Sequence, residues 1–170
     1  YGCLVGSEMC IRDRSDPDQN HAREALAKLD HLVVQDIFMT ETAWHADVIL
    51  PSSAHAEKTG TFTNTNRQVQ LGRQAVPPPG DARQDWWITQ AIAQRMGLDW
   101  SYLHPRDVFN EMAQVMPSLK NITYERLESE NSVTYPCDDP NKPGNEIIFN
   151  EKFPTANGRG KIVPCLLYTS

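Results

Sequence analysis

Apolar residues recur every three or four positions in four segments of the chain, the spacing that places side chains on one face of an α-helix. Asp16 and Asp18 precede the first segment, and either could cap its N-terminus. Gly97 follows the second, as expected for a residue that ends a helix in a left-handed conformation. The spacing therefore predicts helices over residues 18–30, 85–96, 105–116 and 121–130.

Two short apolar runs, residues 32–34 (LVV) and 48–50 (VIL), have the composition of strands that are buried on both faces of a parallel sheet. Thr40 and Thr42 are suited to begin a short helix between them. The order helix, strand, short helix, strand is typical of an α/β fold. We expect the two strands to be parallel neighbours.

The rest of the chain carries weaker patterns. Residues 57–64 (EKTGTFTN) are polar and contain glycine, which predicts a loop, and residues 67–76 alternate as an extended segment would. Residues 77–80 (PPPG) form a stiff linker. From residue 131 onward proline, aspartate and asparagine dominate, which indicates irregular structure with one apolar run at residues 147–149.

Both ends of the chain match translated sequencing adapter. Residues 3–14 (CLVGSEMCIRDR) correspond to a transposase adapter, and residues 165–170 (CLLYTS) to the reverse complement of its end. We therefore expect residues 1–14 and 165–170 to be non-native, and the chain to be part of a longer protein. Of its four cysteines only Cys137 then remains, too few for a disulfide or an iron–sulfur site, which is compatible with a cytoplasmic location.

The net charge of −6 is unchanged when the adapter-like ends are left out. This acidity argues against a nucleic acid as partner, because nucleic-acid-binding surfaces are basic. No apolar run approaches the length of about 20 residues that a membrane-spanning helix needs. We expect neither a nucleic acid nor a membrane as partner.

Three places along the chain carry candidate chemistry. Gln35 and Asp36 follow the first predicted strand, where ligands bind in open α/β sheets, although the spacing alone favours a helix cap or turn for Asp36. Lys58 lies in a glycine-containing loop with Asn64, Asn66 and Arg67 nearby, and could bind a phosphate or be a solvated surface residue. Asp85 stands at the start of a predicted helix and could simply cap it.

A metal site is the less favoured interpretation of four further residues. His45 and Asp47 flank the start of the second predicted strand, and His55 and Glu57 lie in the following loop. Their spacing matches no compact zinc motif. We expect them to be polar residues with structural hydrogen bonds, and we assign no metal-binding and no catalytic residue to the chain.

Residues 32–70 (LVVQDIFMTETAWHADVILPSSAHAEKTGTFTNTNRQVQ) together resemble the molybdopterin oxidoreductase superfamily. The resemblance rests on a strand that ends in Gln-Asp, a TETA segment, the sequence ADVILP and the sequence EKTGTFTNTNRQVQ. Residues 72–88 (GRQAVPPPGDARQDWWI) and 143–164 (PGNEIIFNEKFPTANGRGKIVP) further resemble the catalytic α subunit of cytoplasmic, NAD-linked formate dehydrogenases. The resemblance extends over nearly all of residues 15–164.

By this resemblance the chain is an α/β fragment of a Rossmann-like molybdopterin-binding domain with a helical and irregular C-terminal extension. Residues 15–76 would be the cofactor-binding part, and residues 77–164 would lead to a C-terminal β-barrel domain beyond this chain. The family binds molybdenum or tungsten through two molybdopterin guanine dinucleotides. The residues that the resemblance assigns to cofactor binding are Gln35, Asp36, Lys58 and Asp85.

The resemblance implies that the full-length enzyme oxidises formate to carbon dioxide. Electrons would pass through iron–sulfur clusters to partner subunits that carry iron–sulfur, flavin and NAD sites. The metal ligand, the active-site residues and the iron–sulfur cysteines would lie upstream, so we expect this fragment to be inactive alone. Two alternatives stay open: another reductase of the superfamily, such as a nitrate reductase, or a non-catalytic scaffold paralogue in a respiratory NADH dehydrogenase.

Overall fold

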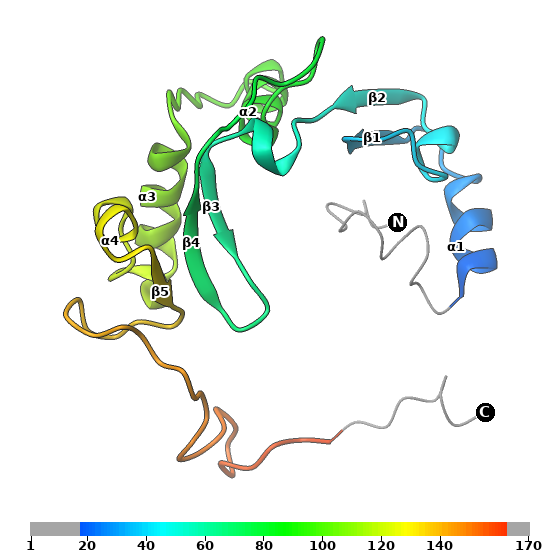
Figure 1. Ribbon diagram of the computed structural model, residues 1–170. Helices are drawn as coiled ribbons and strands as arrows, with labels where there is room; N and C mark the ends of the chain where they lie inside the picture. The colour runs from blue at the N-terminus through cyan, green and yellow to red at the C-terminus, as the bar shows by residue number, and fades with distance from the viewer. Residues whose placement is uncertain (1–17, 163–170) are drawn as a thin grey trace. The chain divides into compact units, whose positions relative to one another are not determined.

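The computed structural model describes residues 18–162 (Figure 1). The adapter-like segments lie outside the described residues. The described chain forms two compact units that alternate along the sequence. Unit 1 comprises residues 18–58 and Val76–Trp100, and unit 2 comprises Thr59–Ala75 and residues 101–162. The predicted boundary between a cofactor-binding part (residues 15–76) and an extension (residues 77–164) stays a prediction, because these compact units do not define the domains of the longer protein.

Unit 1 contains a two-stranded parallel sheet. Val33 pairs with Val48 and Asp36 with Pro51, which confirms the predicted parallel neighbours. Two hydrogen bonds join the residues that precede the two strands. Leu32 N–H donates to the Asp47 carboxylate at 2.7 Å, and Asp47 N–H donates to the Leu32 carbonyl at 2.9 Å. The elements of unit 1 are α1 (Gln19–Leu26), β1 (Val33–Asp36), the 3₁₀ turn η2 (Ala43–His45), β2 (Val48–Pro51), the 3₁₀ turn η3 (His55–Glu57) and α2 (Asp85–Arg95).

The expected burial of both faces of these strands is wrong for this chain. Val34 is buried, but Val33, Val48 and Ile49 are exposed. A parallel sheet becomes buried on both faces only when further strands and helices cover it. Among the described residues this sheet has only two strands. Apolar side chains that a larger, covered sheet would bury therefore remain accessible.

Both helices of unit 1 begin close to their predicted limits, and α2 also ends close to its limit. Asp18 caps α1, with its side chain accepting the His21 N–H at 3.0 Å, which stabilises the first turn. Helix α2 ends at Arg95, and Gly97 just beyond it has a φ of +87°, the left-handed conformation expected there. Helix α1 is shorter than predicted, ending at Leu26.

Unit 2 is a three-stranded antiparallel sheet with helices packed on it (Figure 1). Residues 57–64, predicted to be a loop, instead enter a hairpin in which Gly60 pairs with Gly72. The run Thr61–Thr63 is β-branched and aromatic, which favours a strand once a partner is present. The elements are β3 (Gly60–Thr63), β4 (Gln68–Gly72), α3 (Pro105–Val115), the 3₁₀ turn η4 (Pro117–Leu119), α4 (Tyr124–Glu130) and β5 (Ser132–Thr134).

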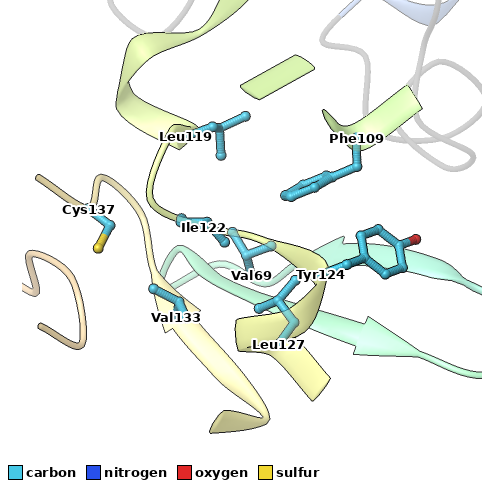
Figure 2. Packing of buried hydrophobic residues seen from close by; sticks show 8 residues of the cluster. All are labelled: Val69, Phe109, Leu119, Ile122, Tyr124, Leu127, Val133 and Cys137. Carbon is cyan, nitrogen blue, oxygen red and sulfur yellow. The ribbon is translucent and has the colours of Figure 1, made fainter. Parts of the chain in front are cut away.

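The core of unit 2 joins the hairpin to the helices (Figure 2). Tyr124 stacks edge-on against Phe109, with ring centroids 5.7 Å apart. Residues far apart in sequence meet here, because Val69 of β4 pairs with Val133 of β5. The buried cluster consists of Val69, Phe109, Leu119, Ile122, Tyr124, Leu127, Val133 and Cys137.

Candidate functional site

The predicted site begins at the carboxyl end of β1. Gln35 and Asp36 are the last two residues of that strand, and β2 runs beside it in the same direction. Successive side chains of a strand point to opposite faces. The Gln35 and Asp36 side chains therefore point to opposite faces of the sheet, and they have different hydrogen-bond partners.

Lys58 and Asp85 come from two further elements of unit 1. Lys58 directly follows the turn η3 in extended conformation, and Asp85 is the first residue of α2. The Lys58 ammonium donates to Asp85 Oδ2 and forms an ion pair with it. Gln35 Nε2 donates to the other oxygen, Asp85 Oδ1, at 2.8 Å. Residues 50 and 27 positions away from Asp85 thus converge on one carboxylate. We call these three residues the Lys58–Asp85–Gln35 cluster.

The cluster is partly shielded from solvent. The Lys58 side chain is 24% exposed and the Asp85 side chain 45% exposed. Burial by itself raises the pKa of Asp85, but the hydrogen bonds from Lys58 and Gln35 and the charge of Lys58 outweigh it, so the pKa lies below its ordinary value of 3.8. Its place in the first turn of α2 further suits a negative charge. Asp85 is therefore ionised at neutral pH.

Asp36 is not joined to this cluster. Its Oδ1 accepts the backbone N–H of the next residue, Ile37, at 2.7 Å. Among the residues that the structure describes, no hydrogen bond links its carboxylate to Gln35, Lys58 or Asp85. Three of the four predicted residues therefore converge through their side chains. None of these contacts tests the predicted role in cofactor binding.

Two of the four residues considered for a metal site accept backbone N–H groups. The Asp47 carboxylate accepts the Leu32 N–H, and Glu57 Oε2 accepts the Ala54 N–H at 2.8 Å. His45 closes the turn η2. Within residues 18–162 no group of three or more histidine, cysteine, aspartate and glutamate side chains is arranged to hold a metal ion.

Arg67 has a role that sequence reasoning did not assign. It has a φ of +67° in the β3–β4 turn, and its guanidinium donates to the carbonyls of Tyr135 at 2.5 Å, Asn145 at 3.1 Å and Glu146 at 2.5 Å. Five donors in a fixed fork allow one arginine to hold several carbonyls at once. Arg67 therefore fastens the irregular segment of unit 2 to the hairpin.

Arg126 was also missed, and it organises the surroundings of Cys137. Its guanidinium forms a two-pronged ion pair with Glu130 at 2.8 and 2.9 Å and donates to the Cys137 sulfur at 3.4 Å. It further donates to the carbonyls of Asn121 and Lys142. The only signal in the sequence was the i,i+4 spacing of Arg126 and Glu130.

The donors of the cluster fit a phosphate-containing cofactor. An ammonium group has three N–H donors, and the pair with Asp85 uses one of them. Gln35 keeps a side-chain carbonyl that can accept a hydrogen bond. A cation, an amide and a carboxylate at the end of a parallel strand suit a ligand that carries both a phosphate and a base with donor groups.

Among residues 18–162 there is no helix with the length and apolarity that crossing a membrane requires.

Comparisons with known proteins assign the family. The model of the molybdopterin oxidoreductase family matches residues 11–95, half of the chain. Over 88% of its length, the chain is 51% identical to the F420-dependent formate dehydrogenase subunit alpha of Methanocaldococcus jannaschii, of which it spans 22%. Over 95% of its length, it is 46% identical to the F420-dependent formate dehydrogenase 2 subunit alpha of Methanococcus maripaludis, of which it spans 24%.

The fold agrees with this assignment. Acetylene hydratase from Pelobacter acetylenicus is similar over 69% of this chain and 16% of its own, with a TM-score of 0.54 and 25% identity. The chain spans less than a quarter of the length of the two curated relatives. The family model, the two relatives and the fold agree, and the chain belongs to the molybdopterin oxidoreductase family, which implies a molybdopterin cofactor with molybdenum or tungsten.

Proposed function

We propose that this chain is part of the catalytic subunit of a formate dehydrogenase, and that it holds one end of a molybdopterin guanine dinucleotide. The observation that carries the proposal is the convergence of Lys58 and Gln35 on Asp85 at the carboxyl end of β1. The names of both curated relatives support formate as the substrate.

In this proposal the residues of the chain bind and orient the cofactor and do no chemistry themselves. Lys58 neutralises the pyrophosphate, while Asp36 and Asp85 accept from the guanine or a ribose hydroxyl, and Gln35 fixes the Asp85 carboxylate. The metal centre, when bound, supplies the two-electron oxidation of formate to carbon dioxide. The guanine dinucleotide form and the iron–sulfur clusters are part of the proposal.

Cofactor retention in the full-length enzyme tests these assignments. Lys58→Ala removes the cation that faces a phosphate, and a lost charged contact weakens binding by about tenfold or more. We expect less metal and pterin per purified subunit in Lys58→Ala and in Asp36→Ala, with partial recovery in Lys58→Arg. Metal analysis and pterin fluorescence measure the content. Lys28→Ala, an exposed lysine of the same unit, is the matched control.

The same purified enzyme separates the alternatives. Wild-type metal content in both alanine variants would contradict the site assignment. A metal-loaded enzyme that reduces nitrate but does not oxidise formate would identify a different reductase. A full-length subunit that carries neither pterin nor metal would identify a scaffold paralogue.

We further propose that the electrons pass through partner subunits to a soluble hydride carrier. The sequence led us to expect NAD, whereas the names of the two cited relatives favour F420 as a second candidate. Formate-dependent reduction of NAD and of F420 by the purified complex, each measured by its own absorbance, decides between them. Reduction of neither carrier would contradict this part of the proposal.

A further inference from the structure

Unit 1 has a concave surface that does not involve the Lys58–Asp85–Gln35 cluster. It is a groove of about 340 Å³ between the end of β2 and one face of α2. Trp87, Ile88, Ala91 and Ile92 lie at helical spacing on α2, so their side chains share that face. With Leu50 and Pro51 they make up the apolar wall of the groove.

Large apolar side chains stay accessible at this groove. Trp87 is 47% exposed and Ile92 43% exposed, although both belong to the lining. The strands beside it are exposed in the same way at Val33, Val48 and Ile49. Parallel sheets are found almost only with both faces covered. The pattern is that of an interior surface whose cover comes from elsewhere.

Two guanidinium groups border the groove. Arg83 donates to the Ala82 carbonyl and Arg95 to the Ala91 carbonyl, each at 2.9 Å. Within the described part of the chain neither forms an ion pair with a carboxylate. Asp81 also lines the groove, which leaves a surplus of one positive charge. A carboxylate on the occupant would complement it.

We propose that this groove is the docking site for a segment of the longer protein that lies outside these 170 residues. The segment presents an apolar stripe to α2 and β2, and a carboxylate to Arg83 or Arg95. The length of the relatives supports this occupant, because more than three quarters of each lies outside the matched region. An apolar groove along a helix suits an amphipathic partner helix. The proposal does not depend on formate as substrate.

Thiol labelling of the full-length enzyme tests whether the groove is covered. Ala91→Cys places a small thiol in the wall, and Thr89→Cys places one at an exposed position of the same helix. We expect the thiol at position 91 to react with a maleimide at least about tenfold more slowly than the thiol at position 89, with equal rates after denaturation. Mass spectrometry of the labelled peptides gives each rate. Equal rates in the native enzyme would overturn the proposal.

Photo-crosslinking identifies the occupant. A benzoylphenylalanine in place of Trp87 preserves an aromatic side chain at the groove. We expect it to crosslink to a peptide of the same polypeptide from outside residues 1–170. A crosslink to a second copy or to a partner subunit would overturn the proposal. Protection of position 91 that disappears when the cofactor is removed would overturn it too, because the occupant would then be the cofactor.

Discussion

The two units of this chain bury different kinds of residue. Unit 2 encloses large side chains, among them Tyr124, Ile122 and Leu127, each 1% exposed or less. The buried residues of unit 1 are mostly small or polar: Ala43, Ala82, Ala93, Ser52 and Ser53 are typical.

Many of the large apolar residues of unit 1 are instead accessible, as Phe38, Trp44 and Trp87 show. Unit 2 obtains its stability from its own core, because apolar burial is the dominant favourable term in folding. We propose above that unit 1 presents polar groups to a ligand and apolar surface to other parts of the protein. The unit that carries the candidate site is thus the one that depends more on its surroundings.

The largest effect that this comparison predicts is at the core of unit 2. Leu127→Ala removes a buried side chain that the rest of this chain encloses, and we expect it to lower the free energy of opening of unit 2 by about 3 kcal/mol. Hydrogen exchange at the amides of β4 and α4 in the full-length protein measures this. Leu103→Ala, at a side chain that is 90% exposed, is the control and should change it by less than about 0.5 kcal/mol. Equal effects of the two substitutions would contradict a tightly packed core in unit 2.

Two glycines with positive φ allow two costs of adding a Cβ to be compared: the cost of an unfavourable backbone conformation and the cost of a steric clash. Gly144 of unit 2 has a φ of +97°, and an added Cβ would lie 1.8 Å from the Thr134 carbonyl oxygen. Gly80 of unit 1 has a φ of +48° and open space around it. We expect Gly80→Ala to cost about 1 kcal/mol from conformation alone, and Gly144→Ala to cost more than about 2 kcal/mol because a carbonyl must move. Local hydrogen exchange compares them. A cheaper Gly144→Ala would contradict the close approach of residue 144 to β5.

Arg67→Lys tests how the irregular segment of unit 2 is held. Lysine cannot reproduce the fork that donates to Tyr135, Asn145 and Glu146, so we expect that segment to open more readily by about 1 kcal/mol. Limited proteolysis between residues 138 and 146 reports this opening. Arg73→Lys is the control. Cleavage at the same rate in Arg67→Lys and in the wild type would show that the segment is held by other contacts.

The smallest effect concerns pH and unit 1. Because the folded-state pKa of Asp85 is lowered, its ion pair stabilises unit 1 above pH 3.8, and the stabilisation is lost as the pH falls through the lower, folded value. Solvent screens a carboxylate that is 45% exposed, so we expect at most about 0.5 kcal/mol. As the pH is lowered from about 5 through 3.8, the free energy of opening of α2 in the cofactor-free, full-length protein should fall in the wild type, and Asp85→Asn should lack this contribution. An identical pH profile in the variant would contradict the pair.

Sequence reasoning reached the parts of the fold that depend on local pattern. Helical spacing located α2, and two apolar runs located the parallel strands β1 and β2. The hairpin strand β3 was missed because Thr61 and Thr63 are polar, and only pairing with β4 makes them a strand. The exposure of Val33 was missed because burial depends on what covers a sheet, which no local pattern contains.

Some residues of the candidate site could be predicted from the sequence and others could not. The family resemblance singled out Gln35, Lys58 and Asp85, and the structure brings their side chains together. It singled out Asp36 too, whose carboxylate accepts the backbone N–H of the next residue. Arg67 could not be assigned, since its partners are backbone carbonyls as many as 79 positions away and any residue has a carbonyl.

The pairing of β4 with β5 also bears on synthesis by the ribosome. Val69 faces Val133 across this pair, so β4 emerges 64 residues before its second neighbour. At about 5–20 residues per second, the strand waits several seconds with one edge unpaired. An open strand edge is a template for association with other chains. Molecular chaperones that shield nascent chains would therefore act on β4 during this interval, before Val133 emerges.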